Sequence, residues 1–182
     1  MKISDIKNPR DVLEFMKSNI QYGWLDYNKE EHINNMENFR RLYRISSVEE
    51  TLEHGMGTCI EQVMLMKFLL DKINIPNKVF CTRVYENEEF NSLDSDVHMH
   101  CFILYYDNDG VHQIEHPNWE RKGIHDYVSE EKAIYEISKI HEKMDNGKSR
   151  IVTEFYEAEP GLSFKEFNLY INGLDRYKKL GI

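Results

Sequence analysis

The chain has 182 residues, enough for one domain with a single hydrophobic core. Its hydrophobic content of 41% and aromatic content of 12% are typical of a folded globular protein rather than a disordered one. With 32 acidic against 23 basic residues, the net charge of −9 argues against nucleic acid or an anionic membrane surface as the main partner.

Neither a secretory signal nor a membrane-spanning segment is recognisable. Residues 1–15 lack a continuous apolar stretch, and no run elsewhere approaches the ~20 apolar residues that cross a bilayer. The cysteines, Cys59, Cys81 and Cys101, are widely spaced and form no CxxC pair, which argues against a disulfide framework or a cysteine zinc site. We therefore expect a cytoplasmic protein with at least one free thiol.

The first predicted helix starts after Asn8, because Asn is a favoured helix cap and Pro9 suits the first helical position. Apolar residues follow at helical spacing. The segment QYGWLDYNKEEH, residues 21–32, interrupts this pattern with a glycine and is predicted to be a turn. A second helix is predicted over about residues 29–44.

Two capping boxes mark the next helices. Ser47 with Glu50 predicts a short helix, and Thr58 with Glu61 predicts a longer one. The segment after Thr58 is rich in good helix formers, with apolar residues recurring at helical spacing. We expect a mostly buried helix that ends near residues 74–77.

Strand patterns dominate the middle of the chain. KVFCTRVYE (residues 78–86) is rich in β-forming residues, and HMHCFILYY (98–106) has the apolar run of a strand covered on both faces. A polar excursion over residues 86–96 separates them. The turn Asp107–Gly110 predicts a hairpin to a third strand, VHQIEH (111–116).

The remaining elements are a helix over about residues 129–145, a strand over 151–158 and a closing helix over 163–174. Helices followed by a mostly antiparallel sheet and then by mixed elements indicate an α+β fold. Because no repeat, low-complexity tract or linker divides the chain, residues 1–182 are predicted to form one domain.

Cys59 falls in the first turn of the helix that Thr58 caps. Unpaired backbone N–H groups and the positive end of the helix dipole lie there, and both favour a thiolate. The same N–H groups can stabilise an oxyanion formed by attack on a carbonyl. The alternative is that Cys59 is a small, inert residue at a helix start.

A thiolate catalyst needs an imidazole within hydrogen-bond reach and a third group that orients the imidazole. His98 and His100 begin the second predicted strand, and Glu115 and His116 end the third. Because a hairpin brings the start of one strand beside the end of the next, the sequence predicts that these residues are neighbours.

The order of these motifs resembles the transglutaminase-like superfamily, whose fold is that of papain-type cysteine proteases. The resemblance is carried by GTC at residues 57–59, HCFILY at 100–105 and IEHPNW at 114–119, and it covers about residues 45–120, the predicted catalytic core. GTCIEQ, EHPNW and GIHDY are similar to segments of bacterial members.

The resemblance implies a papain/transglutaminase-like core, with the nucleophile helix packed on a mostly antiparallel sheet and further helices at the N-terminus. It also implies Cys59 as the nucleophile and His100 as the general base, with no cofactor and no metal.

The third catalytic residue departs from the family pattern. Family members commonly have Asp before the proline, so alignment on Pro117 points to His116, whereas a carboxylate best stabilises an imidazolium and points to Glu115. A four-residue loop over Asp107–Gly110 would place Glu115 on the face of His100, and a three-residue loop with a bulge would place His116 there. We prefer Glu115.

Three other residues are candidates for contacting substrate. Gln62 lies one turn along the helix from Cys59, although a structural hydrogen bond is an equal alternative. His98 shares a strand face with His100 and is expected at the edge of the site. Trp119 is a candidate for a cleft wall, as is Trp24, although large aromatic residues more often simply pack.

These observations predict a thiol enzyme that acts on a peptide or small amide substrate. An acyl-enzyme on Cys59 would pass its acyl group to water or to an amine, and hydrolysis is favoured because water is always present. Two alternatives stay open. One is a catalytically degenerate member that binds a peptide or partner; the other is a zinc protein whose ligands come from His98, His100, Glu115 and His116.

Overall fold

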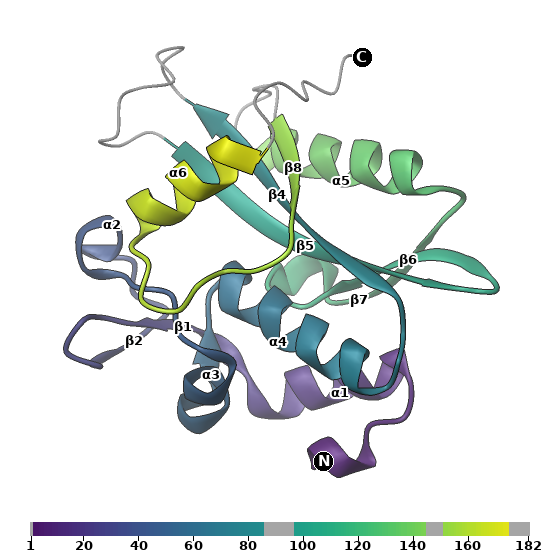
Figure 1. Ribbon diagram of the computed structural model, residues 1–182, viewed down its shortest axis with the longest axis horizontal. Helices are drawn as coiled ribbons and strands as arrows, with labels where there is room; N and C mark the ends of the chain where they lie inside the picture. The colour runs from purple at the N-terminus through teal and green to yellow at the C-terminus, as the bar shows by residue number, and fades with distance from the viewer. Residues whose placement is uncertain (1, 86–96, 145–150, 175–182) are drawn as a thin grey trace.

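The computed structural model describes residues 2–85, 97–144 and 151–174, and the structural statements below concern these residues. Its main feature is a five-stranded sheet in which every neighbouring pair is antiparallel (Figure 1). In order across the sheet, the strands are β7 (Gly123–Tyr127), β6 (Gly110–Glu115), β5 (Val97–Asp107), β4 (Asn77–Tyr85) and β8 (Ile151–Phe155).

The N-terminal part combines helices with a small second sheet of order β2-β1-β3. There β1 pairs antiparallel with β2 and parallel with β3. Its elements in chain order are α1 (Pro9–Asn19), β1 (Gln21–Leu25), β2 (Glu31–Ile33), α2 (Phe39–Leu42), α3 (Val48–His54), β3 (Met56–Gly57) and α4 (Cys59–Lys72).

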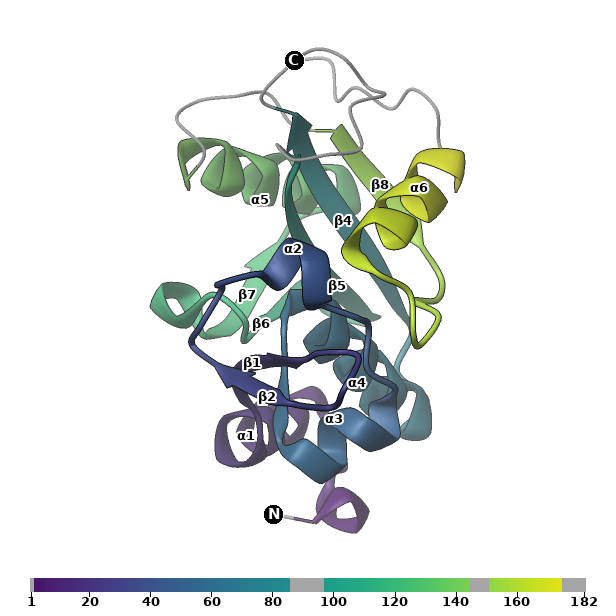
Figure 2. The same ribbon diagram turned by 90° about the vertical axis from the view of Figure 1, so that its left-hand side faces the viewer.

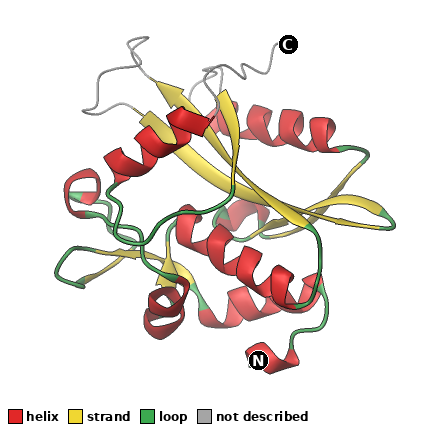
Figure 3. Ribbon diagram, in the orientation of Figure 1, coloured by secondary structure: helices red, strands yellow, loops and turns green. Residues whose placement is uncertain are grey.

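Helices cover both faces of the five-stranded sheet (Figures 2 and 3). Helix α4 packs on one face and α5 (Glu130–Met144) on the other, while α6 (Phe164–Leu174) lies against β8. Strand β5 alternates between the two cores, with Cys101 and Ile103 in the α4 core and Phe102 and Leu104 in the α5 core. This alternation decides which side chains of β5 can meet the start of α4.

The α+β fold predicted from the sequence is confirmed, including the packing of the Cys59 helix on an antiparallel sheet. Helix α1 begins at Pro9 with the side chain of Asn8 as its cap, and both predicted capping boxes form. Strands β4, β5, β6 and β8 and helices α5 and α6 follow in the predicted order. The polar excursion at 86–96 lies outside the described residues.

The prediction for residues 21–32 was wrong, because this segment forms β1 and β2 instead of a turn. Gly23 lies where neighbouring strands come close together. A Cβ at this position would lie 3.1 Å from the carbonyl oxygen of His32 and 3.1 Å from the sulfur of Met56. The glycine therefore lets the strands of the small sheet pack closely.

The predicted helix over 29–44 was also wrong, since only Phe39–Leu42 is helical. Lys29, Asn34 and Asn38 have φ angles of 63°, 51° and 57°, a left-handed conformation that ends a right-handed helix. Strand β7 was missed as well. Within the described part of the chain, no helix has both the length and the apolar character needed to cross a membrane.

Candidate active site

Local sequence fixes the start of helix α4. The Thr58 hydroxyl accepts a hydrogen bond from the Ile60 N–H at 3.3 Å and donates one to the Glu61 carboxylate at 2.6 Å. The same carboxylate accepts the Thr58 N–H at 2.9 Å. Gly57 permits this arrangement, because a Cβ there would lie 2.6 Å from the Cβ of Glu61. Cys59 is thereby held as the first residue of the helix.

The Glu61 carboxylate also ties α4 to the N-terminal part of the protein. It accepts the Tyr43 hydroxyl at 2.7 Å and the Ser46 N–H at 3.2 Å, and all of these groups are buried. Burial raises the pKa of Glu61, against the opposing effect of its donors. The sequence predicted Glu61 only as a capping residue; its further role in anchoring helix α4 depends on tertiary contacts.

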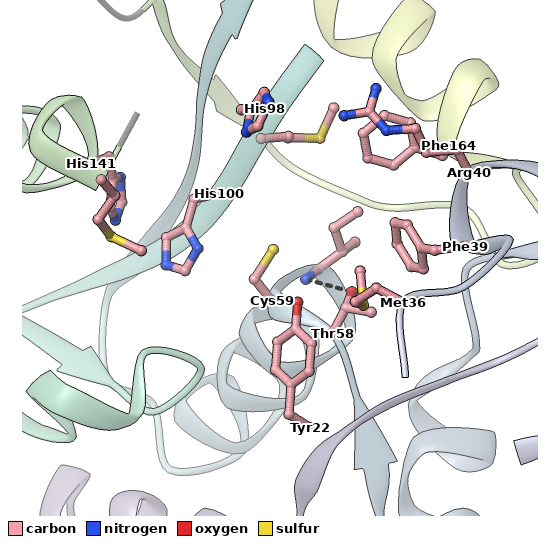
Figure 4. Close-up of a pocket in the computed structure, with 13 residues that line it drawn as sticks. Tyr22, Met36, Phe39, Arg40, Thr58, Cys59, His98, His100, His141 and Phe164 are labelled. Carbon is pink, nitrogen blue, oxygen red and sulfur yellow. Dashed lines mark hydrogen bonds between the residues drawn. The ribbon is translucent and has the colours of Figure 1, made fainter. Parts of the chain in front are cut away.

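The Cys59 thiol is almost fully buried, at 7% exposure, and lines a cavity of about 270 Å³. In Figure 4 the imidazole of His100 and the hydroxyl of Tyr22 both point toward Cys59. A hydrogen bond with Cys101, together with a hydrogen bond to His100 and the charge on that ring, lowers the pKa of Cys59 well below its ordinary value despite burial. The site therefore favours a thiolate.

His100 lies on β5, on the sheet face that α5 covers. Its ring is 4.2 Å from the ring of His141 on α5, in an edge-on arrangement, and it lies between His141 and Cys59 in Figure 4. The Thr82 hydroxyl is 3.0 Å from Nδ1 of His141 and 3.3 Å from the carbonyl oxygen of His100. Thr82 and His141 thus hold the strand segment and the ring beside the thiol.

In the β5–β6 hairpin Asp107 pairs with Gly110, so the loop has two residues, and the register, with Leu104 opposite Gln113, is the same as that expected of a four-residue loop. Alternation along the strands then places Glu115 on the same sheet face as His100, and His116 on the opposite face. The environments of Glu115 and His116 therefore bear on which of them is the third residue of the site.

Glu115 is the candidate for an ion pair with His100, and its carboxylate accepts hydrogen bonds from two neutral donors. Its carboxylate accepts Gln113 Nε2 at 2.8 Å on one oxygen and the Asn118 N–H at 2.9 Å on the other, with only 2% of the residue exposed. Burial raises the pKa of Glu115, while the charge of His100 and the Asn118 N–H oppose that rise. The carboxylate and the His100 imidazolium therefore stabilise each other.

His116 is held differently. Its Nδ1 lies 2.6 Å from Oε1 of Gln62, whose Nε2 in turn donates to the Gly57 carbonyl oxygen at 2.7 Å. Burial, with the charges of Lys122 and Lys17, lowers the pKa of His116 to about 4. A neutral imidazole joined to an amide braces the start of α4. Gln62 thus makes the structural hydrogen bonds foreseen as one of its two roles.

The other predicted contact residues lie in different settings. His98 is exposed and lines the cavity at Cys59. Trp119 is 76% exposed and borders a larger groove of about 910 Å³. Trp24 does not wall the cleft: it is 1% exposed and stacks on His32 with ring centroids 3.9 Å apart, so it belongs to the core of the small sheet.

The cavity and the groove meet at the candidate site, since Tyr22 and His100 line both. Phe39 and Phe164 form an apolar wall of the cavity, with ring centroids 5.7 Å apart. The Arg40 guanidinium lies 5.3 Å from the centre of the Phe164 ring. The groove on the other side of His100 is lined in part by polar side chains, including the Gln62–His116 pair.

Sequence reasoning missed Tyr22, His141 and Phe164. Each comes from an element distant from the recognised motifs: β1, α5 and the start of α6. His141 and Phe164 belong to the C-terminal third of the chain and line the cavity. Nothing local to these residues marks them, so only the folded chain reveals their position.

The residues of the zinc alternative do not gather their ligand atoms. Within the described ranges, the group of His, Cys, Asp and Glu side chains whose ligand atoms lie within 4.8 Å of one another is Asp26, Glu30 and His32. Asp26 Oδ1 already accepts the backbone N–H groups of Asn28 and Glu30, at 2.7 and 2.9 Å. That carboxylate is satisfied by its own loop.

The sequence matches the family described as "Transglutaminase-like domain" over residues 2–105, more than half of the chain. The protein belongs to this family. The family resemblance inferred from the motifs is thus confirmed. The region matched to the transglutaminase-like family contains Cys59 and His100 and ends before Glu115 and His116.

Among solved structures, the protein is similar to an arylamine N-acetyltransferase from Bacillus cereus, whose crystal structure is described as revealing a unique Cys-His-Glu catalytic triad. The TM-score is 0.38 at 17% sequence identity, over 61% of this chain and 42% of that one. This transglutaminase-like chain therefore spans less than half the length of that relative. None of the curated proteins matched the sequence.

Proposed function

We propose that the protein is a thiol-dependent acyl-group enzyme, an amide or peptide hydrolase or an acyl transferase. The observation that carries the proposal is the Cys59 thiol at the start of α4, with its pKa lowered by hydrogen bonds with Cys101 and His100 and with a cavity beside it. A nucleophile, a base and space for a substrate therefore occur together.

In this mechanism His100 holds the proton of Cys59, and the thiolate attacks the carbonyl carbon of the substrate. Two donors are available to the oxyanion: the Cys59 N–H, which precedes the first backbone hydrogen bond of α4, and the Tyr22 hydroxyl that points toward Cys59 (Figure 4). His100 then donates its proton to the leaving group, and an acyl-enzyme remains on Cys59.

Glu115 is our choice for the residue that stabilises the imidazolium of His100. It shares the sheet face of His100, and the charge of that ring opposes the rise that burial causes in the pKa of Glu115. His116 suits the role poorly, because it lies on the other face, is neutral at pH 7 and hydrogen-bonds to Gln62. A carboxylate also stabilises a positive ring better than a neutral imidazole does.

The cavity beside Cys59 and the groove across His100 suggest how a substrate would lie. The wall formed by Phe39 and Phe164 favours an apolar or aromatic acyl group in the cavity beside Cys59. The groove across His100 is the natural place for the leaving amine and for the incoming acceptor, because His100 exchanges a proton with both. Water is the acceptor that we favour.

The test is the rate at which iodoacetamide alkylates Cys59 between pH 5 and pH 9, located by peptide mass spectrometry. We expect Cys59 to react at pH 6 about 10-fold or more faster than a free thiol of ordinary pKa. Replacement His100→Ala should abolish this advantage, and the matched control His98→Ala, altering an exposed histidine on the same strand face, should preserve it.

A second measurement asks whether an acyl-enzyme turns over. p-Nitrophenyl esters with aromatic or short acyl groups serve as donors, and hydroxylamine serves as a trapping amine that yields a hydroxamate. Turnover that depends on Cys59 supports an enzyme. A Cys59 that reacts with iodoacetamide no faster than a free thiol, in a folded protein without ester turnover, would instead identify a degenerate, binding member of the family.

A further inference from the structure

The proposed mechanism uses one cysteine, but the structure places all three together. Cys59, Cys81 and Cys101 are buried, carry free thiols and belong to one hydrophobic cluster between α4 and the sheet. Cys81 and Cys101 are direct partners in the β4–β5 ladder. The Cys101 thiol lies close enough to Cys59 on one side and to Cys81 on the other for both to raise its pKa.

The two thiols at the active site have opposite tendencies. Hydrogen bonds with Cys101 and His100 lower the pKa of Cys59, whereas burial and hydrogen bonds with Cys59 and Cys81 raise the pKa of Cys101 well above its ordinary value. A thiolate that an oxidant can reach through a cavity thus lies against a protonated thiol in the core. Oxidation of the first would place a reactive sulfur beside the second.

We propose that Cys59 and Cys101 form a reversible oxidation site for a hydroperoxide, with hydrogen peroxide as the simplest oxidant and a Cys59–Cys101 disulfide as the product. The inference rests on the proposed function for the thiolate character of Cys59. The disulfide would switch off the nucleophile and at the same time protect it from irreversible oxidation.

The oxidation of Cys59 and Cys101 to a disulfide takes two steps. The Cys59 thiolate attacks one oxygen of hydrogen peroxide, the O–O bond breaks, and the released hydroxide takes the proton held by His100 to become water. The Cys101 sulfur then attacks the sulfur of the Cys59 sulfenic acid. The S–O bond breaks, an S–S bond forms, and the hydroxyl leaves with the Cys101 proton as a second water. Two thiols lose two electrons and one peroxide gains them.

Burial supports trapping within the protein. Cys59 is 7% exposed and lines the cavity, and Cys101 belongs to the same buried cluster behind it. A sulfenic acid that met no thiol would be converted to sulfinic acid by further peroxide. Cys101 therefore determines whether oxidation of Cys59 can be reversed.

The experiment treats the full-length reduced protein with hydrogen peroxide, blocks remaining thiols and maps the peptides by mass spectrometry. We expect a Cys59–Cys101 disulfide in the wild type, and complete recovery of Cys59 alkylation after dithiothreitol. In Cys101→Ala we expect sulfinic acid on Cys59 and no recovery. The matched control Cys81→Ala, which alters the other buried strand thiol, should behave as the wild type.

Two results would overturn the inference. One is sulfinic acid on Cys59 of the wild type at the rate seen in Cys101→Ala; the other is a Cys81–Cys101 disulfide with Cys59 left reduced. The wild-type map decides the question even where Cys101→Ala fails to fold. Iodoacetamide reactivity at pH 6, measured before oxidation, reports on the proposed function separately, so the failure of one proposal is distinguishable from the failure of the other.

Discussion

The two faces of the β5–β6 hairpin each carry a histidine, half-buried His100 and fully buried His116, and the two have opposite surroundings. On the α5 face, His100 has a carboxylate, Glu115, on its own sheet face and the Cys59 thiol within reach. On the α4 face, His116 hydrogen-bonds to the neutral amide of Gln62, and burial lowers its pKa to about 4. Burial alone removes the charge of a histidine; charged partners restore it.

The comparison explains why our proposal gives the two histidines different roles. An imidazole that gains and loses a proton easily can serve a thiol nucleophile, whereas one that stays neutral can only brace structure. The hairpin register decides which histidine obtains which partner. Substitutions at Glu115, Tyr22 and His116, together with His100→Ala, test whether the two histidines differ in this way.

Among these substitutions, Glu115→Gln is expected to lower activity most. Loss of the negative charge should destabilise the imidazolium of His100 and lower kcat/KM for ester hydrolysis by about 10³-fold, with the pH profile of Cys59 alkylation shifted upward. Glu120→Gln, altering an exposed carboxylate at the edge of the groove, is the control. Full activity in Glu115→Gln would mean that the two faces differ for another reason.

Tyr22→Phe should have the next largest effect. Tyr22 lies on β1 and belongs to neither face of the hairpin. Its substitution therefore tests whether the site needs β1 in addition to α4 and the hairpin. Loss of one oxyanion donor should lower kcat by about 10²-fold with little change in KM. Tyr27→Phe, an exposed tyrosine just beyond the same strand, is the matched control. An increase in KM at constant kcat would contradict a role in the transition state.

The smallest effect concerns stability and His116. Because its folded pKa of about 4 lies below the ordinary 6.5, the unfolded state binds more protons as pH falls, and the stabilising contribution present above pH 6.5 is lost on the way to pH 4. The free energy of unfolding should fall by about 2 kcal/mol between pH 7 and pH 5 on this account. Urea unfolding at several pH values measures it.

His116→Gln provides the comparison for that measurement. The variant has no group at this position that titrates between pH 7 and pH 5, so its unfolding free energy should depend less steeply on pH than that of the wild type. His125→Gln, altering another histidine of the same sheet region, should keep the wild-type slope. Equal slopes for His116→Gln and the wild type would show that His116 is not held neutral.

The parts of the site that could be predicted from the sequence are those with local signals. The Thr58–Glu61 capping box places Cys59 at a helix start, and the turn after β5 brings Glu115 near His100 through simple hairpin geometry. Both depend on residues close together in the chain. The choice between Glu115 and His116 depended on loop length, which one sequence leaves open.

The parts that were missed depend on distant packing. The segment between α1 and α3 has weak patterns, and Gly23, read as a turn residue, instead allows close strand packing. Tyr22 and His141 reach the site only because β1 and α5 are placed there by the folded core. The proximity of Cys59 and Cys101 likewise requires α4 to pack on β5, so nothing near either cysteine in the sequence marks the other as its neighbour.

The separation in sequence between Cys59 and His100 has a consequence for biosynthesis. A nascent polypeptide that ends before the second strand of the large sheet lacks His100 and Cys101, the two residues whose hydrogen bonds lower the pKa of Cys59. Thiol reactivity becomes a direct readout of completed folding.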